Sequence, residues 1–122
     1  MTTMKAVRIH SYGGLEVLTY EDVPRPIAGQ GEVLIRVQAT SVNPFDCAVR
    51  AGYMGSYLKH TLPLILGTDV SGMVEAIGAG VTGFSKGDEV YARAGVFRDG
   101  ANAGYVVASA PDVALKPPLL DH

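Results

Sequence analysis

Three polar residues occur where the sequence pattern predicts that regular elements end. Asn43 carries an amide, Thr68 a hydroxyl and Asp69 a carboxylate, and each of these groups can bind a ligand through hydrogen bonds. Binding groups tend to be placed at such positions, because a rigid scaffold holds the loops that carry them. Taken singly, each residue would serve equally well as a cap or turn residue. Ligand recognition and a purely local role therefore both remain open.

Aromatic side chains gather in the stretch that follows Asn43. Phe45, Tyr53 and Tyr57 lie around a glycine-containing loop, together with Met54. Their faces could line a pocket for a flat, conjugated ligand. Aromatic residues of a small domain are also ordinary core residues, so core and loop packing is the alternative.

Neither a nucleophile nor a metal site is predicted from the cysteine and the histidines. Cys47, the single cysteine, has no histidine near it in the sequence, and a lone cysteine is usually a small buried hydrophobe. His10, His60 and His122 show none of the short spacings to Cys, Asp or Glu that are typical of metal ligands. We therefore expect surface or capping roles for the histidines.

The glycines at positions 78, 80 and 83 fit the G-x-G-x-x-G string of dinucleotide-binding sites. That motif holds a pyrophosphate only when it opens a helix. Here Gly87 and Asp88 follow the motif and would break a helix, and the sequence after them is strand-like. We expect a plain turn in which glycines adopt positive φ.

Short elements, mostly strands, are predicted to position these residues. Fifteen glycines and seven prolines limit most elements to roughly 5–8 residues. A helix is predicted for residues 44–50, with Asn43 as its cap, Pro44 in its first turn, Asp46 near the positive end of its dipole and Gly52 at its end. The predicted strands are 5–9 and 15–20, paired as a hairpin through a turn at 12–14, then 32–42, 69–77, 89–93, 105–109 and 113–116. So many short strands favour a mostly β fold, either a sandwich or a small, partly open barrel.

Size and composition exclude several classes of protein. The 122 residues, 48% of them hydrophobic, suit one folded domain over residues 1–122. A net charge of -2 leaves no basic excess for binding nucleic acid. The sequence shows no secretory signal and no apolar run of the roughly 18 residues that span a bilayer. We therefore expect a cytoplasmic protein with neither nucleic acid nor a membrane as its partner.

Several motifs occur in an order that resembles one known family. They are residues 4–8 (MKAVR), 31–37 (GEVLIRV), 41–46 (SVNPFD), 63–72 (PLILGTDVSG), 74–78 (VEAIG) and 80–90 (GVTGFSKGDEV). This ordered set covers nearly the whole chain. It resembles the N-terminal, GroES-like domain of the medium-chain dehydrogenases/reductases, most closely the zinc-independent quinone oxidoreductase and enoyl reductase branch. The resemblance implies a GroES-like, partly open β-barrel with one or two short helices.

The resemblance also implies that no zinc takes part in catalysis. In zinc-dependent members a cysteine ligand stands at the position of Asn43 and a histidine ligand at that of Thr68. An amide and a hydroxyl do not replace thiolate and imidazole ligands. Residues 93–100 are short and contain no cysteine, so the lobe that carries a structural zinc in those members is missing as well.

For function, the resemblance implies hydride transfer from NADPH to a quinone or an α,β-unsaturated carbonyl compound, in a cleft between this domain and a Rossmann domain. Asn43, Asp46 and Thr68 would lie near the nicotinamide, with Asp69 on the side that zinc vacates. Asn43 and Tyr53 would be the catalytic residues, because an amide or a phenol can stabilise developing negative charge without a metal. The residues expected to contact the substrate are Phe45, Tyr53, Tyr57 and Thr68.

Two features set this sequence apart from the family pattern. Asn102 and Gly104 stand where the family has an aromatic residue and a glutamate. The Rossmann fingerprint does not occur in the 122 residues, so we expect the cofactor domain to be absent from this chain and the chain alone to be inactive. The missing cofactor domain would cover apolar surface, which is exposed without it. We therefore expect the chain to self-associate into a homo-oligomer. The alternative is a stand-alone GroES-like binding or assembly module without redox chemistry.

Overall fold

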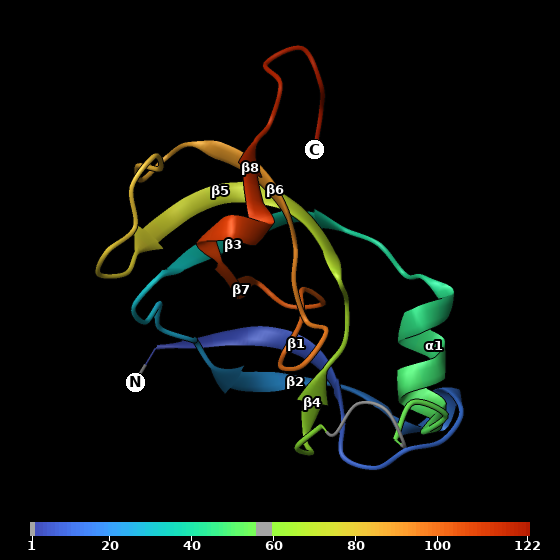
Figure 1. The fold of residues 1–122 in the computed structure, drawn as a ribbon. Coiled ribbons are helices and arrows are strands. Elements are labelled where there is room, and N and C mark those ends of the chain that lie inside the picture. Colours follow the sequence, from blue (N-terminus) through green and yellow to red (C-terminus); the bar gives the residue numbers. More distant parts are fainter. Residues whose placement is uncertain (1, 56–59) are drawn as a thin grey trace.

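The computed structural model describes residues 2–55 and 60–122, which form two antiparallel sheets and one helix (Figure 1). The smaller sheet has the strand order β2-β1-β4, and the larger has the order β7-β3-β5-β6-β8. The strands are β1 (Thr3–Ile9), β2 (Leu18–Pro24), β3 (Glu32–Thr40), β4 (Leu64–Ile65), β5 (Asp69–Ile77), β6 (Glu89–Arg93), β7 (Tyr105–Ser109) and β8 (Val113–Leu115), and the helix is α1 (Pro44–Ala51).

The larger sheet curls around the main hydrophobic core. Val33 and Ile35 of β3, Val74 of β5, Val90 of β6 and Val106 of β7 are almost completely buried. Alternate residues of a strand point to the same face of its sheet. The two-residue period in the sequence therefore becomes one continuous apolar surface. The mostly β, partly open barrel predicted from the sequence is confirmed.

The first two strands form the predicted hairpin, although its second strand begins and ends later than predicted. Residues 15–17 form a 3-10 turn, and the Gly14 N–H next to it donates to the Glu16 carboxylate at 3.1 Å instead of to a strand partner. Strand β2 then continues to Pro24, which lies opposite Thr3. Proline is tolerated there because β2 is an edge strand.

The remaining elements follow the prediction closely. Strands β5, β6 and β7 have the predicted bounds, whereas β3 ends at Thr40 and β8 at Leu115, slightly earlier than predicted. Helix α1 begins at Pro44 and ends before Gly52, whose φ of 88° places it in the left-handed region that favours glycine. Strand β4 was not predicted, because two residues are too few to show an alternating pattern. Within residues 2–55 and 60–122, no helix has the length and apolar character needed to cross a membrane.

The glycine-rich stretch after β5 is the plain turn that the sequence predicted. Gly80 and Gly83 have φ values of 80° and 87°, and the next regular element is strand β6 rather than a helix. Gly78 lies so close to the preceding connection that an added Cβ would come within 1.7 Å of the Gly29 carbonyl oxygen. The glycine at 78 is therefore required for packing, and the turn lacks the helix that a pyrophosphate site needs.

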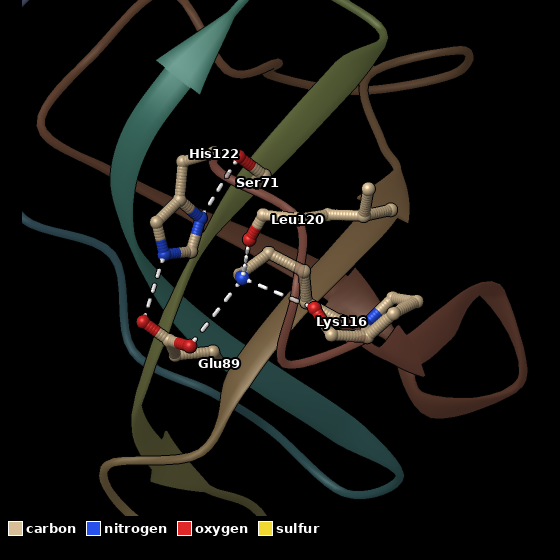
Figure 2. Close-up of polar contacts among 6 residues, drawn as sticks. Ser71, Glu89, Lys116, Leu120 and His122 are labelled. Atoms are coloured by element: carbon tan, nitrogen blue, oxygen red, sulfur yellow. Dashed lines mark hydrogen bonds and ion pairs between the residues drawn. The ribbon is translucent and has the colours of Figure 1, made fainter.

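Polar contacts hold the segment after β8 against strands β5 and β6 (Figure 2). The Lys116 ammonium lies 3.4 Å from the Glu89 carboxylate and also donates to the Leu120 carbonyl. The His122 ring lies 3.0 Å from the Ser71 hydroxyl and 3.3 Å from Glu89. The hydrogen bond from His122 and the charge of Lys116 lower the pKa of Glu89 below its ordinary value of 4.5. Glu89 is therefore the common partner of Lys116 and His122.

An ion pair between Glu32 and Arg98 is expected to make stability depend on pH. Arg98 and the backbone N–H of Gly29 donate to Glu32 and hold the pKa of its carboxyl below the ordinary 4.5. A lowered folded pKa stabilises the protein above the unfolded value, and that contribution is lost as the pH falls through the folded value. Glu32→Gln should therefore be about 0.5 kcal/mol less stable than the wild type at pH 7, with the gap closing as the pH falls below 4.5.

Urea unfolding of both proteins across this pH range measures the effect. Glutamine keeps an oxygen that can accept from Gly29, so the comparison isolates the charge. Arg98→Gln should show the same dependence on pH, because it removes the other member of the pair. A gap between wild type and Glu32→Gln that stays constant down to pH 2 would contradict the prediction.

Candidate functional site

Helix α1 and the segment leading into it fix the position of Asn43. Strand β3 ends at Thr40, and Asn43 caps the helix that begins at Pro44. The Asp46 carboxylate turns back and accepts the backbone N–H of Asn43 at 2.9 Å. Only 3% of Asp46 is exposed, whereas Asn43 is half-buried. The N-terminal turn of α1 therefore holds Asn43 at a defined place beside the end of β3.

The first residue of β5 completes this arrangement. The Asp69 carboxylate accepts the Asn43 amide at 2.7 Å and the Ser41 hydroxyl at 3.2 Å. The Asn43 amide also lies 3.4 Å from the Ser41 oxygen, and the Thr40 hydroxyl donates to the Asp69 carbonyl at 2.8 Å. Asn43 and Asp69 are thus brought together. A ligand that accepts a hydrogen bond from Asn43 has to displace one of these contacts, and the one to Ser41 is the longest.

Thr68 lies next to this cluster but faces the interior. Only 8% of the residue is exposed, and its carbonyl accepts the Ala94 N–H at 2.7 Å. The preceding Gly67 has a φ of 108°, a backbone conformation that favours glycine. Of the predicted polar site residues, Thr68 is therefore much less accessible to a ligand than Asp69.

The structure separates the aromatic residues that the sequence grouped together. Phe45 packs on a buried cluster that contains Ile9 and Val49, which is the role the packing alternative gave it. Tyr53, by contrast, is 78% exposed just beyond the end of α1. Tyr57 lies outside the described residues. The hydroxyl of Tyr53 is therefore available to a ligand, whereas the ring of Phe45 mainly supports the helix.

A groove of about 570 Å³ lies beside these residues and was not foreseen from the sequence. It is called the Asn102 groove here, and its lining includes Val7, Leu18, Thr40, Val42, Asp46 and Asn102. Among the described residues that the sequence nominated for the site, Asp46 is the one that lines it. The signal that could have located it is the run of small residues on both sides of Asn102, from Gly100 to Gly104.

Metal ligands are not concentrated in the part of the chain that the structure describes. No group of three His, Cys, Asp or Glu residues is close enough there to hold a metal ion. The two carboxylates of the site are also engaged, Asp46 by a backbone N–H and Asp69 by Asn43 and Ser41. The chemistry that this cluster offers is hydrogen bonding.

Removing the Asp69 carboxylate should release the Asn43 side chain. In Asp69→Ala we expect the side-chain amide resonances of Asn43 to move and its hydrogens to exchange faster with water. The loss in the free energy of unfolding should be about 1 kcal/mol, the size of one hydrogen bond. Asp112→Ala, at an exposed position outside the cluster, is the control. Asn43 resonances that coincide in wild type and Asp69→Ala would show that Asp69 does not hold the amide.

Comparisons with known proteins agree with this fold. Residues 29–118 match the alcohol dehydrogenase GroES-like domain family. The quinone oxidoreductase of Lama guanicoe is 41% identical over 119 residues, which cover 97% of this chain and 35% of that protein. A mitochondrial NAD(P)H oxidoreductase of Dictyostelium discoideum is 37% identical over 123 residues, which cover 98% of this chain and 35% of that protein.

A solved structure shows the same similarity. The quinone oxidoreductase of Coxiella burnetii superposes with a TM-score of 0.88 at 32% identity, over 98% of this chain and 39% of that one. The chain therefore spans little more than a third of the length of these relatives.

Proposed function

This chain belongs to the alcohol dehydrogenase GroES-like domain family, and from that premise we propose that it forms the substrate side of an oxidoreductase that transfers a hydride from NADPH to a quinone or an α,β-unsaturated carbonyl compound. The relatives named as quinone and NAD(P)H oxidoreductases support the reaction class. We further propose that residues 1–122 are one domain and that a Rossmann domain, outside this chain, holds the nucleotide. The turn at Gly78–Gly83 supports this division, because it opens no helix.

The Asn43–Asp69 pair is the observation that carries the proposal. It places an amide and a carboxylate 2.7 Å apart, with Asn43 at the position where zinc-dependent members have a cysteine ligand and Asp69 next to Thr68, at the position of their histidine ligand. An amide and the largely buried hydroxyl of Thr68 do not fit zinc, which is bound by thiolate, imidazole and carboxylate. We therefore propose zinc-independent chemistry and route no step through a metal.

The same cluster fits the nicotinamide end of a dinucleotide. Its carboxamide both donates and accepts hydrogen bonds, and Asn43, Ser41 and Asp69 offer partners of both kinds. Asp46 would act indirectly, by holding the backbone of Asn43. Bound NADPH would supply the hydride, and the chain itself would bind and orient the reacting groups.

The chain's own residues would act on the substrate oxygen. When Asn43 gives up its contact with Ser41, one amide hydrogen becomes available to an oxygen that gains negative charge. Tyr53 is exposed enough to donate its phenolic hydrogen, and water is the other source of the proton. A cytoplasmic location and self-association remain predictions, and one relative named above is mitochondrial.

NADPH oxidation with 1,4-naphthoquinone tests the proposal. The 122-residue chain alone should give no turnover, whereas the protein from the natural source, with a mass about three times 12.8 kDa, should be active. Asn43→Ala in that protein should lower kcat/KM about 100-fold, the usual effect of removing an oxyanion donor. Asp112→Asn should leave kcat/KM unchanged. Turnover by the chain alone, or a natural protein of 12.8 kDa that forms a ring without binding NADPH, would overturn the proposal.

A further inference from the structure

The segment around Asn102 runs beside the residues that lead to Asp69. The backbone N–H of Asn102 donates to the Leu66 carbonyl at 2.9 Å, and that of Ala101 donates to the Gly67 carbonyl at 3.0 Å. An added Cβ at Gly67 would lie 2.7 Å from the end of the Asn102 carboxamide. These backbone bonds therefore end two residues before Asp69, where the carboxamide of Asn102 packs against Gly67.

Asp69 itself is held by two consecutive hydroxyl groups at the point where β3 ends. The Thr40–Val70 pair is the last one between β3 and β5, so Asp69 lies just beyond it. The Asp69 carbonyl accepts the Thr40 hydroxyl at 2.8 Å, and the Asp69 carboxylate accepts the Ser41 hydroxyl at 3.2 Å. The same carboxylate holds the Asn43 amide. The place of Asn43 therefore depends on how firmly Thr40 and Ser41 hold Asp69.

The Thr40 hydroxyl decides which end of the Asn102 carboxamide faces it. A threonine hydroxyl has one hydrogen to donate, and a carbonyl oxygen can only accept, so this hydrogen goes to Asp69. The Thr40 oxygen also lies 3.2 Å from the Asn102 carboxamide, and this second contact needs a donor from the amide. The two ends of a carboxamide have nearly the same shape, and the hydrogen-bond network determines which is which. The NH₂ group of Asn102 therefore faces Thr40, and the hydrogen bonds run from Asn102 through Thr40 to Asp69.

This chain of hydrogen bonds restricts a hydroxyl that would otherwise rotate. Thr40 is exposed and Asn102 is half-buried, so water competes for the Thr40 oxygen. An N–H that donates to this oxygen leaves the hydroxyl hydrogen directed at the Asp69 carbonyl, and linked hydrogen bonds strengthen one another. Asn102 thereby acts on Asp69 through Thr40.

We propose that Asn102 is a positioning residue of the candidate site, which acts through Thr40 to hold Asp69 and, through Asp69, the Asn43 amide. Asn102 needs no contact with substrate or cofactor in this role. That the arrangement serves hydride transfer rests on the proposed function. The chain of hydrogen bonds itself does not, because all of its members belong to this domain.

Asn102→Asp tests the proposal by NMR on the 122-residue chain at pH 7, because a carboxylate has the shape of the amide but no hydrogen to donate. It also offers the Thr40 hydrogen a second acceptor and so weakens the bond to Asp69. We expect the side-chain resonances of Asn43 to move and its amide hydrogens to exchange with water about twofold to fivefold faster, the range for one exposed hydrogen bond. Gln30→Glu replaces an amide by a carboxylate at an exposed position elsewhere and should leave Asn43 unchanged.

Variants of Thr40 separate this role from mere packing of the segment around Asn102. Thr40→Val, which lacks the hydroxyl, should change the Asn43 resonances as Asn102→Asp does, whereas Thr40→Ser should keep them near wild type. Adding Asn102→Asp to Thr40→Val should cause no further change, because the hydroxyl through which Asn102 acts is already gone. Additive effects of the two substitutions, or Asn43 resonances that stay in place in Asn102→Asp, would overturn the proposal.

The wild-type chain decides the question even if these variants fail to fold. One amide hydrogen of Asn102 should exchange with water about threefold more slowly than those of the exposed Gln30 and should show cross-relaxation with the Thr40 side chain. If both Asn102 amide hydrogens exchange as fast as those of Gln30, Asn102 does not donate to Thr40 and the proposal is wrong.

The natural protein tests whether the arrangement serves the reaction. With NADPH and 1,4-naphthoquinone, Asn102→Asp should lower kcat about fivefold and leave both KM values within about twofold, whereas Gln30→Glu should change neither. An unchanged kcat in an active protein would overturn the assignment of Asn102 to the reaction. A natural protein without turnover, while Asn43 in the 122-residue chain still responds to Asn102→Asp, would instead overturn the proposed function alone.

Discussion

Gly95→Ala is expected to lower the free energy of unfolding by about 3 to 4 kcal/mol, the largest single-residue effect that we predict. Gly95 has a φ of 67°, which costs an alanine about 1 kcal/mol. The added methyl group would also lie 2.5 Å from the Gly67 carbonyl oxygen and 2.6 Å from the Gly100 Cα. Overlap with backbone atoms cannot be relieved by a side-chain rotation, so it adds about 2 to 3 kcal/mol.

Gly95→Ala should also distort the candidate functional site. Gly100 donates to the Ile65 carbonyl at 2.8 Å, and Ala101 donates to the Gly67 carbonyl at 3.0 Å. These bonds join the strand that leads to Thr68 with the segment that carries Asn102. Pushing Gly67 and Gly100 apart would therefore disturb both sides of the candidate site.

Gly80→Ala is the matched control for Gly95→Ala. Its φ of 80° is equally unfavourable for alanine, but no atom lies within 4 Å of the added Cβ. We expect a loss of only about 1 kcal/mol. Urea unfolding of the two variants beside wild type measures the difference. Similar losses in both variants would show that backbone conformation, rather than close packing, requires the glycine at 95.

Asp46→Ala is expected to destabilise the protein by about 2 kcal/mol. The variant leaves the Asn43 N–H, which lies in a partly buried contact, without its acceptor. Losing the half of the capping box that Asp46 supplies costs about 1 kcal/mol, and a partly buried donor left without an acceptor costs about as much again. Asp46→Asn retains an oxygen that can accept the same N–H, so it should lose about half as much.

Comparing the two Asp46 variants also separates the contribution of the hydrogen bond to the Asn43 N–H from that of the negative charge. Thermal unfolding gives the stabilities, and the backbone amide resonance of Asn43 reports on the hydrogen bond itself. Equal losses in the two variants would mean that the negative charge at the helix N-terminus, rather than the hydrogen bond, supplies the stability. An unchanged Asn43 resonance in Asp46→Ala would contradict the role assigned to Asp46.

The elements that carry the site were predictable because their signals are local. Helix α1 follows from Pro44 after a capping residue, and strand β5 follows from an alternating pattern that begins at Asp69. The 3-10 turn at residues 15–17 was not predictable in the same way. Leu15 and Val17 continue an apolar alternation, while the Gly14 backbone takes the Glu16 carboxylate as its partner.

Residue order and spacing were enough to predict the mostly β class, the helix that begins at Pro44, the glycine turn after β5 and the family. Each of these follows from the order of the residues or from a pattern of apolar and polar residues that is local in the sequence. Which side chains meet depends on how the sheets and the helix pack in three dimensions. Asn43 reaches Asp69 across 26 residues, and Thr40 reaches Asn102 across 62. An alternating pattern fixes the face of a strand on which a residue lies, whereas the curling of the two sheets decides its neighbours. For the same reason Phe45 is packed and Tyr53 exposed, although both are aromatic residues of one short stretch.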